Sequence, residues 1–287
     1  MKRTAYSLLL TTTALALVFA LPALAQDDAM TSHGPGGQTS MTEHSSGLTL
    51  HQVLANYYKA MGGLDKIKSV KTQKATGKMT MGPAGEVPFT MEAKRPNKVR
   101  IEFTFQGMKG IQAYDGTTAW MFMPFMGKTA PEQMPEAQAK DMKEQADIDG
   151  PLVDYQEKGN KVELVGKKEV QGSDAYELKV TLKDGDVRNF FLDADAFVPI
   201  MVTSVHQMQG NPVEVETTLG DYKEVDGLMM PFSITSKPKG APEGQGQTIT
   251  IDKMELNQDI PDSDFTMPKT APAAKAEGGN GSGSGLR

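Results

Sequence analysis

A two-residue alternation of apolar and polar side chains is the feature of this 287-residue chain that most restricts its fold. It begins near Val70 and is clearest in residues 75–81, 87–94 and 98–105, where one face is apolar and the other is polar or charged. Half-solvated antiparallel strands require this pattern. The chain is therefore predicted to form an antiparallel sheet with one apolar face.

Further strands are expected along most of the remaining chain. Asp115-Gly116 predicts a hairpin turn between strands at 111–114 and 118–123. The later strands are expected at residues 162–165, 175–182, 187–193, 199–207, 213–219, 232–236 and 248–256. A sheet of roughly a dozen strands either splits into a sandwich or curls toward a barrel.

Two segments break the alternation with helical patterns. Thr49 and Gln52 fit a capping box at the start of an amphipathic helix over residues 50–61, which Gly62-Gly63 ends. A short helical turn is expected at 64–69. Residues 131–155 form a polar, helix-prone insert with only a thin apolar stripe.

The ends of the chain predict export and three non-globular segments. Lys2 and Arg3, an apolar run over 8–21 and small residues up to Ala25 are typical of a cleavable signal peptide, residues 1–25. Residues 26–47 and 269–287 are low-complexity segments that are expected to be disordered. One β domain, residues 48–268, remains.

Composition narrows the location and the partners. The chain has no cysteine, which excludes disulfides, thiolate chemistry and a lipid anchor at the cleavage site. Losing Lys2 and Arg3 moves the formal net charge from −6 to −8, which argues against nucleic acid as a partner. We therefore expect a periplasmic protein that is not an integral membrane protein.

The sequence offers no catalytic constellation, cofactor motif or metal site. Of its four histidines, His33 and His44 fall in the leader, and His51 and His206 lack the spacing of a metal-binding pair. The Gly281–Gly285 repeat is out of phase with a hydrolase nucleophile elbow. We therefore expect no enzymatic activity.

One acidic hairpin has enough carboxylates to hold calcium in principle. The carboxylates around it are those of Asp184, Asp186, Asp193 and Asp195. Ordinary turn chemistry explains them better, because aspartate commonly bonds its own backbone in turns.

Methionine is unusually frequent, with 19 in the chain and many in or beside the predicted strands. Its flexible, polarisable side chain either fills gaps in a core or adapts to variable apolar ligands. Composition alone favours the first interpretation.

Two stretches resemble a known family. Lys94-Arg95-Pro96-Asn97 precedes a strand, and Asp115-Gly116 is followed by Trp120 and then Pro124-Phe125. This order resembles the LolA-like family of periplasmic lipoprotein carriers, the outer-membrane lipoprotein-sorting proteins. Residues 220–222, 227–232 and 264–265 are similar to segments of the wider LolA-like group.

The resemblance implies a mainly β fold: a half-open antiparallel β-barrel of roughly eleven strands, with an N-terminal helix and a helical lid insert, around an apolar cavity for acyl chains. It also implies that Arg95 is a latch that hydrogen-bonds to the lid helices. Val99 departs from the pattern, because the carriers have a larger aromatic residue at that place. This departure leaves the identity of the cargo open.

We therefore expect a carrier that binds a chain of ~15 methylenes, from a lipoprotein or a free lipid, for outer-membrane lipoprotein sorting or lipid transport. It would exchange its cargo with an envelope donor or acceptor protein. A lipid-sensing envelope regulator that binds a partner protein is the alternative, and an integral barrel is disfavoured by the charged outer faces. The expected cavity lining is Met79, Met81, Phe89, Met91, Val99, Ile101, Phe103, Phe105, Trp120, Phe122, Leu178 and Val180.

Overall fold

The computed structural model describes residues 47–80, 85–208, 211–242 and 244–270. The predicted signal peptide therefore lies outside the described residues, as do nearly all of the leader and tail. Met81, which was expected in the cavity lining, lies outside them as well.

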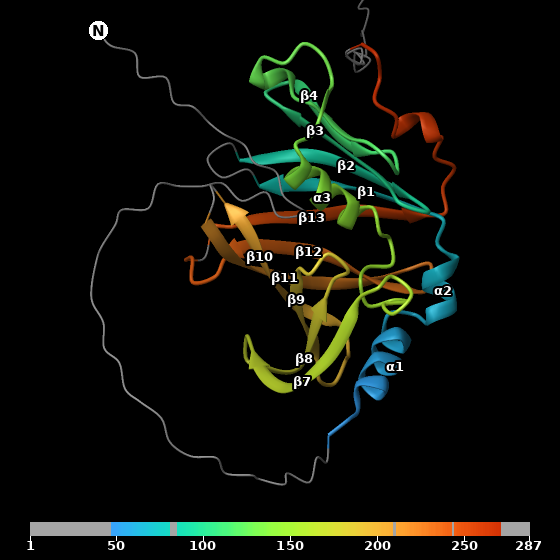
Figure 1. Cartoon of the computed structure of the whole chain (residues 1–287), viewed down its shortest axis with the longest axis vertical. Coiled ribbons are helices and arrows are strands. Elements are labelled where there is room, and N and C mark those ends of the chain that lie inside the picture. The colour runs from blue at the N-terminus through green and yellow to red at the C-terminus, as the bar shows by residue number, and fades with distance from the viewer. Residues whose placement is uncertain (1–46, 81–84, 209–210, 243, 271–287) are drawn as a thin grey trace, which may run out of the picture.

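One antiparallel sheet of thirteen strands forms the body of the described chain (Figure 1). Its spatial order is β6-β5-β4-β3-β2-β1-β13-β12-β11-β10-β9-β8-β7, so nearly every strand pairs with its neighbour in sequence. The strands are β1 (Thr72–Thr80), β2 (Glu86–Lys94), β3 (Lys98–Phe105), β4 (Met108–Tyr114), β5 (Ala119–Phe122), β6 (Glu132–Gln133), β7 (Lys161–Val170), β8 (Ser173–Thr181), β9 (Val187–Asp193), β10 (Pro199–Met208), β11 (Asn211–Val225), β12 (Leu228–Pro238) and β13 (Gln247–Leu256).

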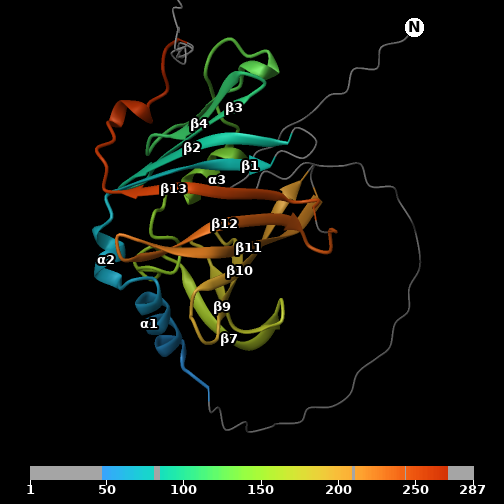
Figure 2. The ribbon, with the colours of Figure 1, turned by 180° about the vertical axis from the view of Figure 1, so that it is seen from behind.

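The sheet is an open half-barrel, because its edge strands β6 and β7 do not pair with each other. These two strands are consecutive in the chain, so residues 134–160 must cross from one edge of the sheet to the other. The crossing segment carries helix α3 (Glu136–Gln145) over the concave face (Figures 1 and 2). The predicted half-open barrel is confirmed, with more strands than expected. The two-residue β6 is too short to show an alternation.

Two further helices lie beside the other half of the sheet. Helix α1 (Leu50–Ala60) begins at the predicted capping box, in which the Gln52 amide N donates to Thr49 Oγ1 at 3.3 Å and the Thr49 amide N donates to Gln52 Oε1 at 2.9 Å. Helix α2 (Leu64–Ser69) follows directly. Two 3-10 turns, η2 (Pro124–Met126) and η3 (Asp262–Asp264), complete the described elements. No helix among the described residues is long and apolar enough to cross a bilayer.

The C-terminal segment after β13 covers part of the convex face, along β1–β5 (Figure 2). Trp120 Nε1 donates to the Phe265 carbonyl at 2.7 Å, and Phe265 is completely buried. The Arg100 guanidinium lies 5.9 Å from the Trp120 ring centre and donates to the Asp264 carbonyl at 3.0 Å. Both faces of this half of the sheet are therefore covered.

Candidate ligand cavity

A cavity of about 160 Å³ lies between the concave face of the sheet and helix α3. It is bounded by residues of β1, β2, β3, β12 and β13, by one residue of β4, and by the segment that carries α3. Its lining residues are Gln73, Ala75, Met79, Phe89, Met91, Ile101, Phe103, Gln112, Met134, Met142, Gln145, Met230, Pro231, Ile234, Gln247, Ile249, Ile251 and Met254.

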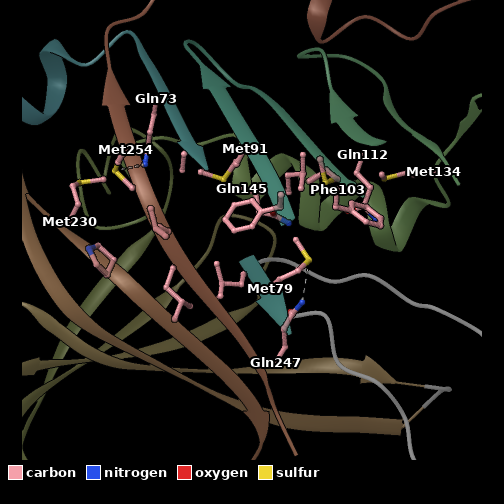
Figure 3. Close-up of a pocket in the computed structure, with 18 residues that line it drawn as sticks. Gln73, Met79, Met91, Phe103, Gln112, Met134, Gln145, Met230, Gln247 and Met254 are labelled. Atoms are coloured by element: carbon pink, nitrogen blue, oxygen red, sulfur yellow. Dashed lines mark hydrogen bonds between the residues drawn. The ribbon is translucent and has the colours of Figure 1, made fainter. Parts of the chain in front are cut away.

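The lining is apolar and rich in methionine. Figure 3 shows the thioethers of Met79, Met91, Met230 and Met254 around the same space, with the Phe103 ring among them. Strand register brings these residues together: Ala75 pairs with Met91 on one side and with Met254 on the other. Because methionine changes shape cheaply, this wall can adapt to ligands of different outline.

Four glutamines give the cavity a polar component (Figure 3). Gln73 Nε2 donates to Met254 Sδ at 3.4 Å, and Gln247 Nε2 donates to Met79 Sδ at 3.8 Å. Gln145 differs, because its Oε1 is buried and has no hydrogen-bond partner in the part of the chain that the structure describes. A thioether is a weak acceptor, so the amides of Gln73 and Gln247 each donate one weak hydrogen bond to sulfur.

Arg95 ties the segment after α3 to the end of α2. Its Nη1 and Nη2 donate to the two carboxylate oxygens of Asp149 at 2.6 and 2.5 Å. Nη2 also donates to the Ile67 carbonyl at 3.1 Å, and Nε donates to the Val70 carbonyl. The Asp149 carboxylate raises the pKa of the Arg95 guanidinium. The arginine fork thus joins two helical segments through one side chain.

A second set of charges joins α3 to the hairpin between β8 and β9. Arg188 Nη2 donates to Glu144 Oε2 at 2.9 Å, and Lys140 Nζ lies 2.9 Å from Asp184 and 2.8 Å from Asp186. Asp141 is buried beside them, and burial followed by the charge of Glu144 raises its carboxyl pKa to about 7. Helix α3 is thus attached to the sheet through these charged contacts as well as through the apolar cluster around Met142.

Five of the twelve expected lining residues border the cavity: Met79, Phe89, Met91, Ile101 and Phe103. All five lie on β1–β3, where alternation assigns the concave face directly. Their contact with a ligand stays a prediction.

The other described residues of that expected set lie elsewhere. Val99 is completely buried in the cluster with Met142 and Ala146, and Phe105 packs edge-on to Phe125 at 5.3 Å. Trp120 and Phe122 are on the opposite face of the sheet, because they pair with Ala113 and Ile111 while Gln112 takes the cavity face. Leu178 and Val180 are packed beneath α1.

The four aspartates around the acidic hairpin do not come together as one cation site in the described structure. Asp193 Oδ1 accepts the backbone amides of Asp195 and Ala196 at 3.0 and 2.7 Å, as in an ordinary turn. The third carboxylate beside Asp184 and Asp186 is that of Glu144. One carboxylate oxygen from each of these three residues lies within 4.8 Å of the others. Lys140 and Arg188 already neutralise these carboxylates.

A serine–histidine contact on β10 was not expected from the sequence. Ser204 Oγ lies 2.7 Å from His206 Nε2, and burial lowers the pKa of that imidazole. The two residues are neighbours on one face of a regular strand, whereas the hydrolase elbow is a sharp turn between a strand and a helix. The contact serves to pair two partly buried polar groups.

Comparison with solved structures assigns the fold to the LolA-like class. A LolA superfamily protein from Nitrosomonas europaea has a TM-score of 0.51 and 14% identity, covering 77% of this chain and 98% of that one. A DUF1329 family protein from Desulfovibrio piger has the same TM-score and identity, covering 75% and 97%. A domain described as a putative outer membrane lipoprotein-sorting protein, from Vibrio parahaemolyticus, has a TM-score of 0.49 and 12% identity, covering 75% and 94%.

At this level of identity the likeness shows the fold alone. A family model described only as an uncharacterized protein matches residues 91–269, more than half of the chain, and the chain belongs to that family. No curated protein matches this chain.

Proposed function

We propose that this protein is a periplasmic carrier that binds the apolar chain of a lipoprotein or a free lipid in the cavity under α3. The observation that carries the proposal is an apolar, methionine-lined space of about 160 Å³ on the concave face of a half-barrel. Ligand sites are typically concave and mostly apolar with a few polar groups, and this pocket has that character. The likeness of the fold to a LolA superfamily protein supports the same class of ligand.

The volume restricts how such a ligand enters. A cavity of about 150 Å³ holds one benzene ring, so the closed cavity accepts a short segment and not a chain of ~15 carbons. The expected burial of a whole chain therefore requires α3 to move away from β1–β3. Each further methylene buried as the lid moves contributes about 0.8 kcal/mol.

The contacts of α3 suit a lid that opens. Its N-cap is Pro135, which makes no side-chain capping bond, and its buried residues are Asp141 and Met142. The Arg95 fork and the Arg188–Glu144 pair would hold it in the closed state, while ligand binding shifts the population toward an open state. Cargo would then pass to an envelope acceptor protein, since an apolar chain leaves such a site slowly into water.

A cavity-filling variant tests the proposal. Ala75→Leu adds three carbon atoms to a side chain that lines the cavity, and it should abolish the lipid that co-purifies with the native protein, as measured by extraction and mass spectrometry. The control is Ala93→Leu on β2, a buried alanine that does not line the cavity. It should lower the melting temperature through overpacking while lipid is retained. Equal lipid content in the wild type and the Ala75→Leu protein would contradict the proposal.

A further inference from the structure

We propose that the ligand carries a neutral hydrogen-bond donor, a hydroxyl or an amide N–H, which the side-chain carbonyl of Gln145 accepts inside the cavity. This inference rests on the proposed function and specifies the chemistry of its ligand. It separates a purely hydrocarbon ligand from an amphiphile whose polar group is buried together with its chain.

The starting observation is the inner face of α3. Helical spacing places Gln138, Met142 and Gln145 on one side of the helix, since residues three, four and seven apart share a face. Two side-chain oxygens on this face are buried with no hydrogen-bond partner among the described residues, Oε1 of Gln138 and Oε1 of Gln145. Buried polar atoms in native proteins are nearly always paired, so each exception calls for a specific cause.

Only one of the two glutamines reaches the cavity. Gln145 belongs to its lining, together with Met91 and Phe103, whereas Gln138 does not (Figure 3). With α3 in place, water does not reach Gln145 Oε1, and a simple apolar chain that entered as α3 moves would leave this oxygen without a partner. A ligand with a donor at the same place would satisfy it, which is why the site should prefer such a ligand.

The opposite wall supports the same chemistry. The amide of Gln73 is spent on the sulfur of Met254, a weak acceptor, across the cavity from α3. Gln73 is half-buried, and an amide whose bond is to a thioether keeps the capacity to pair with a polar group of a ligand. The lining therefore combines an adaptable apolar wall with polar side chains that suit one buried polar group.

Three neutral probes of equal chain length test the inference. Methyl tetradecanoate has no donor, its 3-hydroxy derivative carries a hydroxyl on the chain, and N-methyltetradecanamide carries an amide N–H in place of the ester oxygen. Equimolar pairs are incubated with the delipidated full-length protein, and the bound ligand is extracted after gel filtration and quantified. The wild type should prefer at least one donor-bearing probe over the ester by about tenfold, the value of one net hydrogen bond. Which donor wins distinguishes a hydroxylated chain from an amide-linked one.

The variants assign the effect to one atom. Gln145→Met should reduce the preference to about one by weakening the binding of the donor-bearing probes. Gln138→Met is the matched control, because it removes the same kind of unpartnered oxygen from the same helix outside the cavity. It should keep the wild-type preference.

The possible failures are distinct from one another. If the wild type binds all three probes equally, or if Gln145→Met keeps the preference, the inference is overturned and the carrier proposal stands. If none of the three binds to the wild type, the proposed function itself is overturned. The comparison in the wild type needs no variant, so a poorly folded Gln145→Met protein would still leave the inference open to refutation.

Discussion

The two halves of the half-barrel are covered by helices of very different kinds. Under α1, the side chains of Val53, Leu54 and Tyr57 pack on Leu178 and Leu192, and Tyr58 donates to the Leu152 carbonyl at 2.8 Å. Helix α1 is therefore part of the core of its half.

Helix α3 covers the other half without filling it. It contributes one buried apolar side chain, that of Met142, and it buries Asp141. The comparison shows one sheet with two differently covered halves: in one the helix packs into the core, and in the other it leaves spare volume, where we propose that the ligand binds.

The largest expected difference between the halves concerns core truncation. Leu178→Ala should lower the free energy of unfolding by about 2–5 kcal/mol and leave lipid binding unchanged, because Leu178 is completely buried beneath α1. Ile249→Ala should cost less stability, because Ile249 already borders empty space, and it should weaken binding. Urea unfolding and lipid extraction of both variants measure the contrast. Equal effects of the two variants on binding would remove the distinction.

The next effect concerns Arg95. Arg95→Met leaves the Asp149 carboxylate, whose side chain is 8% exposed, without its partner. The free energy of unfolding should fall by about 2–3 kcal/mol. This is less than for a fully buried ion pair, because the Arg95 side chain is 29% exposed. Adding Asp149→Leu should recover much of this loss. Stopped-flow exchange of a fluorescent lipid should be faster in Arg95→Met, and an unchanged rate would show that Arg95 does not restrain the lid.

A pH effect should follow from Asp141. Its pKa is raised from 3.8 to about 7, so between these values the folded protein keeps a proton that the unfolded chain has lost. The contribution of Asp141 to the free energy of unfolding is therefore greatest at low pH. It falls as the pH rises from about 4 to about 7, by up to about 1.4 kcal/mol per pH unit. Asp141→Asn should remove this slope. Parallel pH profiles of unfolding for the two proteins would contradict the assignment.

The smallest effect is expected at Lys140. Its pairs with Asp184 and Asp186 are 37–45% exposed, so Lys140→Met should change stability by less than about 1 kcal/mol. High salt should have a similarly small effect on the wild type. A loss above 2 kcal/mol in thermal unfolding would mean that α3 depends on this contact more than its exposure suggests.

The sequence predicted the elements well, because their signals are local. Alternation located β1–β3, the capping box located the start of α1, and Asp115-Gly116 located the turn between β4 and β5. The thin stripe of the insert correctly indicated α3, whose Met142 is buried as a helical period requires.

The cavity was harder to predict, because it depends on which surfaces cover each face. Alternation sorts β5 into two faces but does not say that residues 257–268 cover the side that carries Trp120. It also does not show that α1 fills the space beside Leu178. Strand β13 pairs with β1, although the two are about 180 residues apart in sequence. No local pattern could therefore show that Ile249 and Ile251 line the cavity.

Photo-crosslinking tests the central claim most directly. A tetradecanoic acid with a diazirine in its chain is bound to the native protein, activated, and mapped by peptide mass spectrometry. Labels are expected on cavity residues of β1, β2 and β13, such as Met79, Met91 and Met254, and on Met142 of α3. Labels on Leu178 and Val180, or on the convex face around Trp120, with none in the cavity, would contradict the account.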